Sequence, residues 1–132
     1  VEVQISTDIL YGSGVAQLAA PAQQALASLA DALKPWPNHV RVEGHTDNKP
    51  INTALFRSNW ELSAARAASV VRLFAERGVA PQRLSVVGHG EQQPVQTNAT
   101  EAGRNANRRV AVVILGSEGV NQPSAVPVPA AP

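Results

Sequence analysis

The chain has 132 residues, of which 44% are apolar and 16% are charged, enough material for one folded domain with a single core. Eleven basic residues nearly balance ten acidic ones, so the formal charge is +1, and we expect no nucleic-acid partner because no broad positive field exists. The absence of cysteine excludes a disulfide framework, a thiol nucleophile and a cysteine zinc site. Because methionine is also absent, we expect the chain to be a processed product or part of a longer protein.

The first third of the chain predicts a strand, a helix and a second strand. Apolar and polar residues alternate over 1–6, as in a half-buried strand. A helix is expected from Pro21 to Leu33, where apolar residues recur at steps of three and four. Residues 40–43 alternate again and lead directly into the polar stretch 44–47, so a functional site is plausible at this strand end.

The middle third predicts a loop followed by a long helix. Residues 48–57 have no clean period and are expected to form a loop. Ser58 and Glu61 have the spacing of a capping box, with the cap residue three positions before the glutamate. The helix that starts there is expected to run to Arg77 and to end at Gly78.

The last third predicts two more strands and a tail. Residues 84–87 read as a strand, and a short helical turn is expected near 101–106. The unbroken run of β-branched and apolar residues at 110–115 indicates a strand covered on both faces. Four prolines scattered through 117–132 predict a Pro/Ala-rich disordered tail, which leaves 1–116 as the folded domain.

These elements predict the order strand, helix, strand, helix, strand, strand. Such an order favours an α+β fold, an α/β two-layer sandwich in which helices pack on one face of a sheet. The longest apolar run spans six residues, far below the ~20 that a membrane-crossing helix needs.

One cation stands out in the helix after Ser58. Its apolar wheel sector contains Ala64, Ala67, Ala68, Val71, Phe74 and Ala75. Arg66 lies beside that sector, one turn after Leu62. An arginine among apolar side chains calls for an anion, which Asp47 or a ligand carboxylate can supply. Two plainer alternatives remain open: an Arg66 whose stem crosses apolar surface to reach water, and an Asp47 that only stabilises a turn.

The start of the same helix adds a further element to this candidate site. The first backbone N–H groups of a helix are unpaired and suit a carboxylate. Together with Asp47 and Arg66, they would offer one anion and two donors of positive character. That combination matches a zwitterion better than a simple anion.

Other constellations are weaker. His45 and Asp47, two apart on an extended segment, could help to bind a metal with His39 or His89. A triad of Ser85, His89 and an aspartate lacks the nucleophile-elbow motif. Arg104, Arg108 and Arg109 form a small basic cluster, which reads most simply as a solvated strand entry because few aromatic residues accompany it.

Several separated motifs now resemble the OmpA-like peptidoglycan-binding domain in order and spacing. They are Tyr11-Gly12-Ser13-Gly14-Val15-Ala16, Gly44-His45-Thr46-Asp47-Asn48, Asn59-Trp60-Glu61-Leu62-Ser63-Ala64-Ala65-Arg66-Ala67, Gly88-His89-Gly90, Pro94, Asn98, and Gly103-Arg104-Asn105-Ala106-Asn107-Arg108-Arg109-Val110. The resemblance covers about residues 1–116. It implies a mixed four-stranded sheet with helices on one face.

The resemblance also implies a ligand and the residues that bind it. Members of the family hold the peptide stem of peptidoglycan through its diaminopimelate residue, which is a zwitterion. The residues that correspond to the family's pocket are Thr46, Asp47, Asn59, Leu62, Arg66 and Arg108. The resemblance implies no catalysis, no cofactor and no metal.

Within the family, the long loop after Lys49 and the segment from Ser58 to Ser63 look like flagellar stator B subunits of the MotB or MotD kind. This implies a periplasmic domain of an inner-membrane protein whose transmembrane helix is absent from this chain. The implied partners are peptidoglycan, a stator A subunit (MotA-like) reached through that missing part, a second copy of the chain, and flagellar basal-body rings. The alternatives are a Pal- or OmpA-type outer-membrane tether and a metal-dependent peptidoglycan hydrolase.

Overall fold

A computed structural model describes residues 2–7, 11 and 16–116 of the chain. The predicted tail at 117–132 lies outside the described residues, as does most of the motif that begins at Tyr11. Among the described helices, none is both long enough and apolar enough to cross a bilayer.

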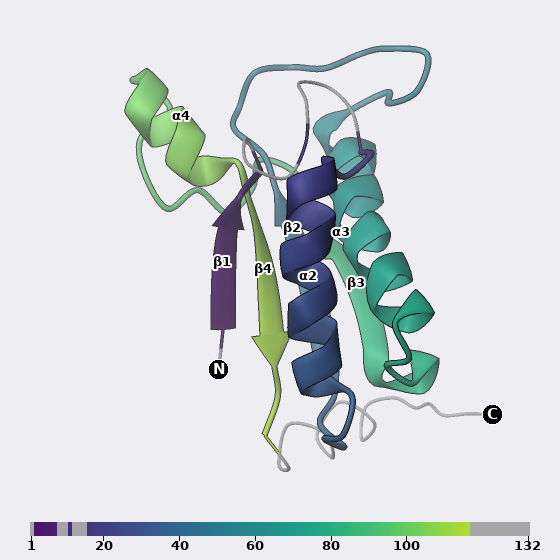
Figure 1. Cartoon of the computed structure of the whole chain (residues 1–132). Helices are drawn as coiled ribbons and strands as arrows, with labels where there is room; N and C mark the ends of the chain where they lie inside the picture. The colour runs from purple at the N-terminus through teal and green to yellow at the C-terminus, as the bar shows by residue number, and fades with distance from the viewer. Residues whose placement is uncertain (1, 8–10, 12–15, 117–132) are drawn as a thin grey trace, which may run out of the picture.

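Four strands form one mixed sheet (Figure 1). They are β1 (Glu2–Ser6), β2 (Val40–His45), β3 (Leu84–Gly88) and β4 (Arg109–Ile114). Their order across the sheet is β1-β4-β2-β3. Strand β4 runs antiparallel to both β1 and β2, whereas β2 and β3 are parallel, so the predicted mixed four-stranded sheet is confirmed.

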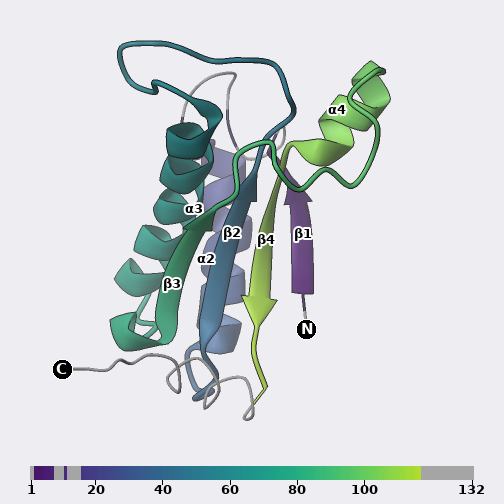
Figure 2. The ribbon, with the colours of Figure 1, turned by 180° about the vertical axis from the view of Figure 1, so that it is seen from behind.

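Two helices cover one face of this sheet (Figure 1). They are α2 (Ala20–Leu33) and α3 (Asn59–Glu76). Viewed from behind, none of the described helices lies in front of the body of the sheet (Figure 2). The predicted two-layer α+β architecture is therefore confirmed.

A further helix, α4 (Glu101–Asn107), stands between β3 and β4 in the chain, where the sequence predicts only a helical turn. It lies beyond the end of the sheet at which β1 and β2 finish (Figure 1). A short 3₁₀ turn, η1 (Pro81–Arg83), precedes β3. The helix thus extends the predicted order of elements without changing the layers.

The core lies between the sheet and the two long helices. Alternate residues of the central strands point into it, as the two-residue period of a strand requires. Its fully buried side chains include Leu26, Val40, Val42, Val70, Phe74, Val110 and Val112. These positions account for most of the apolar periodicity in the sequence.

Strand β4 is buried as predicted along most of its length, but for a different reason on its second face. Val110 and Val112 face the core, and Ala111 is only 2% exposed. In the sheet register, Ala111 lies between Gln4 of β1 and Glu43 of β2. The predicted burial on both faces is therefore found over Arg109–Val112, although no described helix lies over the second face.

Helix α3 presents a buried face that is rotated from the predicted sector. Ala64, Ala68, Val71 and Ala75 are only partly buried, whereas the line through Leu62, Arg66 and Val70 is buried. The predicted sector included the small alanines at the edge of the buried face because they are apolar. It left out Arg66 because arginine is charged. The helix ends at Glu76, and Gly78 takes a φ of +106°, as a helix-terminating glycine does.

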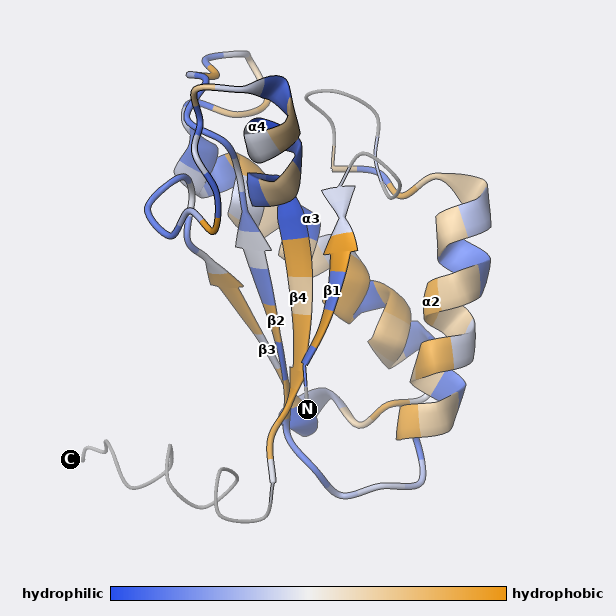
Figure 3. Cartoon of the chain, turned by 90° about the vertical axis from the view of Figure 1, so that its left-hand side faces the viewer, coloured by the Kyte–Doolittle hydropathy of each residue, from blue (hydrophilic) through white to orange (hydrophobic). Residues whose placement is uncertain are grey.

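Two glycines set the approach of α3 to the sheet. A Cβ atom on Gly44 would come within 2.2 Å of the Ser63 carbonyl oxygen, and one on Gly88 within 2.8 Å of Ala64. The helix backbone therefore packs directly against the ends of β2 and β3. Figure 3 shows that α4 and the loops around it, at this same end of the molecule, are mostly hydrophilic.

Candidate functional site

The segment that leaves β2 carries two buried polar residues, Thr46 and Asp47, which are 5% and 7% exposed. The backbone N–H of Thr46 donates to the Gly90 carbonyl (2.8 Å), and its hydroxyl donates to the Asp47 carbonyl (2.8 Å). One carboxylate oxygen of Asp47 accepts from the backbone N–H of Lys49 (3.0 Å). Asp47 therefore does form the turn that the plainer reading expected.

The other oxygen of Asp47 has a cationic partner. Arg108 donates to it from Nη1 at 2.6 Å, and donates from Nη2 to Glu101 at 2.6 Å. The side chain of Asp47 is 9% exposed and that of Arg108 19%, whereas that of Glu101 is 63% exposed. The hydrogen bond from Arg108 lowers the pKa of the Glu101 carboxyl below its usual value. A single guanidinium thus bridges a buried and an exposed carboxylate.

Helix α4 and the loop before it place Arg108. Asn107 is fully buried, and its side-chain oxygen accepts from the backbone N–H groups of Val95 and Gln96 (2.8 and 2.9 Å). Thr100 caps the helix by accepting from the backbone N–H of Gly103. Arg108 is the C-cap of α4, directly before β4. Its position is therefore fixed by the rigid element on each side.

Asn59 ties the start of α3 to the same place. Its side-chain amide donates to the Lys49 carbonyl (3.0 Å) and to the Glu91 carboxylate (3.0 Å), with a longer contact to the Asp47 carbonyl (3.4 Å). Leu62, one turn further along the helix, is 6% exposed. Four of the six predicted site residues, Thr46, Asp47, Asn59 and Arg108, are thereby linked by direct contacts or adjacency in the chain.

The first amides of α3 are already used by the predicted capping box. The Ser58 hydroxyl accepts from the backbone N–H of Trp60 (3.2 Å) and donates to the Glu61 carboxylate. This hydrogen bond and those from the backbone N–H groups of Glu61 and Ser58 lower the pKa of the Glu61 carboxyl. Local side chains therefore already bind amides that we expected to hold a ligand carboxylate, and a ligand would have to replace them.

Arg66 lies two turns into α3 and is 6% exposed. Its guanidinium carbon is 5.0 Å from the centre of the Tyr11 ring, a cation–π distance. The Tyr11 hydroxyl donates to the Arg66 carbonyl (2.6 Å) and is 3.0 Å from the Ser69 hydroxyl. Burial raises the pKa of Tyr11 to about 12. The plainer alternative, a guanidinium that reaches water, is wrong.

Sequence reasoning missed two carboxylates at this site, Glu91 and Glu101. Each contacts a predicted site residue: Glu91 contacts Asn59, 32 residues away, and Glu101 contacts Arg108, seven residues away. No periodic signal marks them, because both lie in or next to loop segments. Glu101 stands in the position after the Thr100 cap, where acidic residues are common in any helix.

The residues predicted as a metal site and those predicted as a catalytic triad do not come together in those combinations. Ser85 lies 3.4 Å from the His39 ring, whereas His89 pairs with Glu43 at 3.0 Å. Within the described residues, the group with the makings of a metal site is Glu43, His45 and His89. Burial and the nearby Arg109 lower the pKa of His45 to about 4, so its ring is neutral at physiological pH.

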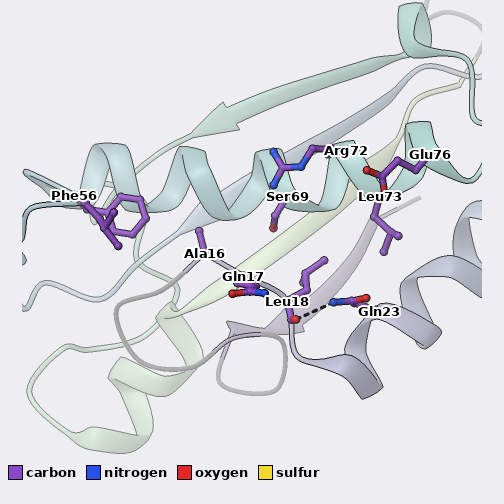
Figure 4. Close-up of a pocket in the computed structure, with 10 residues that line it drawn as sticks. Ala16, Gln17, Leu18, Gln23, Phe56, Ser69, Arg72, Leu73 and Glu76 are labelled. Carbon is purple, nitrogen blue, oxygen red and sulfur yellow. Dashed lines mark hydrogen bonds between the residues drawn. The ribbon is translucent and has the colours of Figure 1, made fainter.

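A separate cavity of about 600 Å³ runs along another side of α3 (Figure 4). It is lined by Ala16, Gln17, Leu18, Gln23, Leu55, Phe56, Ser69, Arg72, Leu73 and Glu76. None of the six predicted site residues is among them. Because the cavity holds none of these residues, the charged end of the sheet remains the candidate site.

The chain is similar to known proteins in both sequence and fold. The family model described as OmpA matches residues 10–108. Motility protein B of Bacillus subtilis is 37% identical over 117 residues, 86% of this chain. Peptidoglycan-binding protein ArfA of Mycobacterium tuberculosis is 38% identical over 107 residues, 80% of this chain. The chain spans only 44% and 32% of the lengths of these two relatives.

Solved structures agree with the sequence relatives. The cell wall anchor of the type VI secretion system (T6SS) of Pseudomonas aeruginosa superimposes with a TM-score of 0.83 at 38% identity, covering 88% of this chain and 81% of that one. A MotB-like protein from Desulfovibrio vulgaris superimposes with a TM-score of 0.80 at 32% identity, covering 86% and 73%. Sequence and fold therefore point to the same group of proteins.

Proposed function

Because this chain belongs to the OmpA family, we propose that it binds peptidoglycan without catalysing a reaction and anchors a flagellar stator unit to the cell wall. The observation that carries the proposal is the buried Asp47, ion-paired with Arg108 at the end of β2. A buried ion pair contributes little net stability. Binding of a ligand with matching charges would account for a buried ion pair at the end of β2.

The ligand we propose is the diaminopimelate residue of a peptidoglycan stem peptide. Its side chain ends in one carboxylate and one ammonium, and we assign Asp47 as the anion and Arg66 and Arg108 as the cations that receive them. An arginine fork binds a carboxylate through two parallel hydrogen bonds, which a lysine cannot reproduce. In this arrangement Asp47 orients the ammonium, and the arginines hold the carboxylate.

Glu101 occupies the position on Arg108 that a ligand carboxylate would take. Its exposed carboxylate occupies Nη2 of Arg108 while Asp47 occupies Nη1. We propose that a ligand carboxylate replaces Glu101 on Arg108 and leaves the buried pair with Asp47 intact. The exchange swaps one charge-assisted hydrogen bond for another, so it needs no rearrangement of the sheet.

Sedimentation with purified cell-wall sacculi tests the proposed ligand. The chain should sediment with sacculi whose stem peptides contain diaminopimelate, and far less with sacculi in which lysine replaces it, since lysine lacks the second carboxylate. Arg108→Gln should reduce sedimentation, whereas Arg104→Gln, a neighbour that bonds Glu101 and the Asn98 carbonyl, should not. Equal sedimentation with both wall types would contradict the diaminopimelate assignment.

The stator role and the periplasmic location rest on similarity to Motility protein B and to the MotB-like structure. We propose that the chain is the periplasmic part of an inner-membrane protein and works as a dimer beside a stator A subunit. Cross-linking of the full-length protein in cells should recover that subunit. A strain that lacks the full-length protein should lose swimming while keeping its flagella.

A second anchor role is favoured by one observation. The type VI secretion anchor matches this chain at 38% identity, above the 32% of the MotB-like structure. The same wall-binding site would then hold a different machine, or an outer-membrane tether of the Pal or OmpA type. Normal swimming in the deletion strain, with wall binding preserved in the purified chain, would favour this alternative.

A further inference from the structure

Three side chains meet on the sheet face that no described helix covers. Glu43 and His45 project from β2 on that face, and His89 follows the end of the neighbouring β3. One ligand atom from each residue lies within 4.8 Å of those of the other two. The two imidazole rings stack with centroids 4.6 Å apart.

The two oxygens of the Glu43 carboxylate have different partners. Its Oε1 faces both imidazoles, 3.0 Å from Nε2 of His89 and 3.9 Å from Nε2 of His45. Its Oε2 accepts from Nε of Arg41 at 2.6 Å. Arg41 thus fixes the orientation of the carboxylate and leaves Oε1 directed at the histidines, as outer partners of metal ligands do.

His45 is the most buried member of the cluster. It is 5% exposed, and its Nδ1 has no hydrogen-bond partner among the described residues. Its other ring nitrogen, Nε2, lies 3.9 Å from Oε1 of Glu43 and is the atom placed to bind an ion. We propose that Glu43, His45 and His89 bind one divalent transition-metal ion of the zinc or nickel class on the open face of the sheet.

The spacing needs only a small adjustment to accept the ion. Ligands about 2.0–2.1 Å from a tetrahedral zinc lie roughly 3.3 Å from one another. The distances of 3.0 and 3.9 Å from Glu43 bracket that value. The nearly parallel rings, 11° apart, must tilt so that their nitrogens converge, and His89, the more exposed of the two, makes this movement. Three protein ligands leave the fourth position to water.

The charges around the cluster are balanced. Arg41 neutralises Glu43, while Arg109 and Glu2 act on His45 with opposite effects on its pKa. Arg109 donates hydrogen bonds to the Asn107 and Gln93 carbonyls. A divalent cation would meet the neutral His45 ring, the His89 ring and one carboxylate. The site does not depend on the peptidoglycan proposal, and no reaction is assigned to it.

Calorimetric titration of the full chain, free of any histidine tag, with zinc chloride and then nickel chloride tests the site. We expect one ion per chain with micromolar affinity. His89→Gln and Glu43→Gln should each weaken binding by about tenfold or more, an effect of about 1.4 kcal/mol or more. His39→Gln is the matched control, because His39 is the remaining histidine and contacts Ser85 instead.

Nuclear magnetic resonance of the imidazole nitrogens gives a readout that a merely destabilised variant cannot imitate. In the parent chain, zinc should shift the signals of His45 and His89 and leave those of His39 unchanged. The proposal is overturned by the absence of saturable binding below about 100 µM, by equal loss of affinity in His39→Gln, or by unchanged His45 and His89 signals at saturating zinc.

Discussion

The helix-covered face of the sheet and the end of the sheet beyond β2 are built from the same strands but follow different rules. The covered face is apolar: Val40 and Val42 are fully buried beneath α2 and α3. Two residues past the end of the strand, Asp47 is nearly as buried but charged and paired with Arg108. The first region supplies stability, and the second holds charges whose burial costs stability. We therefore propose the end of the sheet, rather than the covered face, as the site of function.

The largest effect should come from the covered face. Phe74→Ala removes a fully buried ring and should lower the free energy of unfolding by about 3–5 kcal/mol. Urea unfolding followed by circular dichroism measures this loss. Where the variant is folded, its affinity for wall fragments should equal that of the parent. A folded variant with much weaker binding would break the separation between the two regions.

His45 stands at the border between the regions and should make stability depend on pH. Its folded-state pKa of about 4 lies below the ordinary 6.5, so the neutral ring stabilises the fold fully above pH 6.5, and this contribution is lost as the pH falls toward 4. We expect a loss of roughly 2 kcal/mol across that window. Urea unfolding at several pH values measures it.

The matching control keeps the buried position but removes the titration. His45→Asn should flatten the pH dependence between 6.5 and 4, whatever its overall stability. His39→Asn should leave it in place. An unchanged slope in His45→Asn would assign the acid sensitivity to other groups, with Glu43 the first candidate, because its pKa is also lowered.

At the charged end, exchange of one cation for another should affect binding rather than folding. Arg66→Lys keeps the charge but loses the planar fork, so affinity for a diaminopimelate muropeptide should fall about tenfold. Arg72→Lys is the control on the same helix, in the wall of the separate cavity. Calorimetry measures both, and equal affinity of Arg66→Lys and the parent would remove Arg66 from the ligand contacts.

The smallest expected effect is an increase in the affinity for muropeptide. Glu101→Gln removes the exposed carboxylate that competes for Arg108, so muropeptide affinity should rise about threefold, or about 0.6 kcal/mol. Fluorescence competition against a labelled muropeptide resolves such a difference. Weaker binding in Glu101→Gln would mean that Glu101 orients Arg108 for the ligand and is not displaced by it.

The sequence was a good guide to the covered face and to the order of elements. Strand alternation and helical steps depend on local spacing, and the helix from Ala20 to Leu33 and the capping box at Ser58 follow from them directly. The orientation of α3 could not be obtained in this way. Arg66 is buried because Tyr11, 55 residues away, supplies an aromatic face and a hydroxyl, and no local pattern reports such a contact.

The sequence predicted which residues belong to the candidate site, but it did not predict which of them contact one another. Asp47 and Arg108 are 61 residues apart, and their ion pair depends on how α4 enters β4. The same holds for Glu91 and Glu101, which carry no periodic signal. The use of the α3 amides by Ser58 and Glu61 was implicit in the capping box, because a box that forms occupies the donors that a ligand would need.

Calorimetric titration of the chain with a diaminopimelate-containing muropeptide, beside Asp47→Asn and Arg66→Ala, tests the central claim most directly. The account predicts saturable binding by the parent and a loss of about tenfold or more in both variants, each with the parent's circular dichroism spectrum. Binding by Asp47→Asn and Arg66→Ala as strong as that of the parent, or no binding by the folded parent, would contradict it.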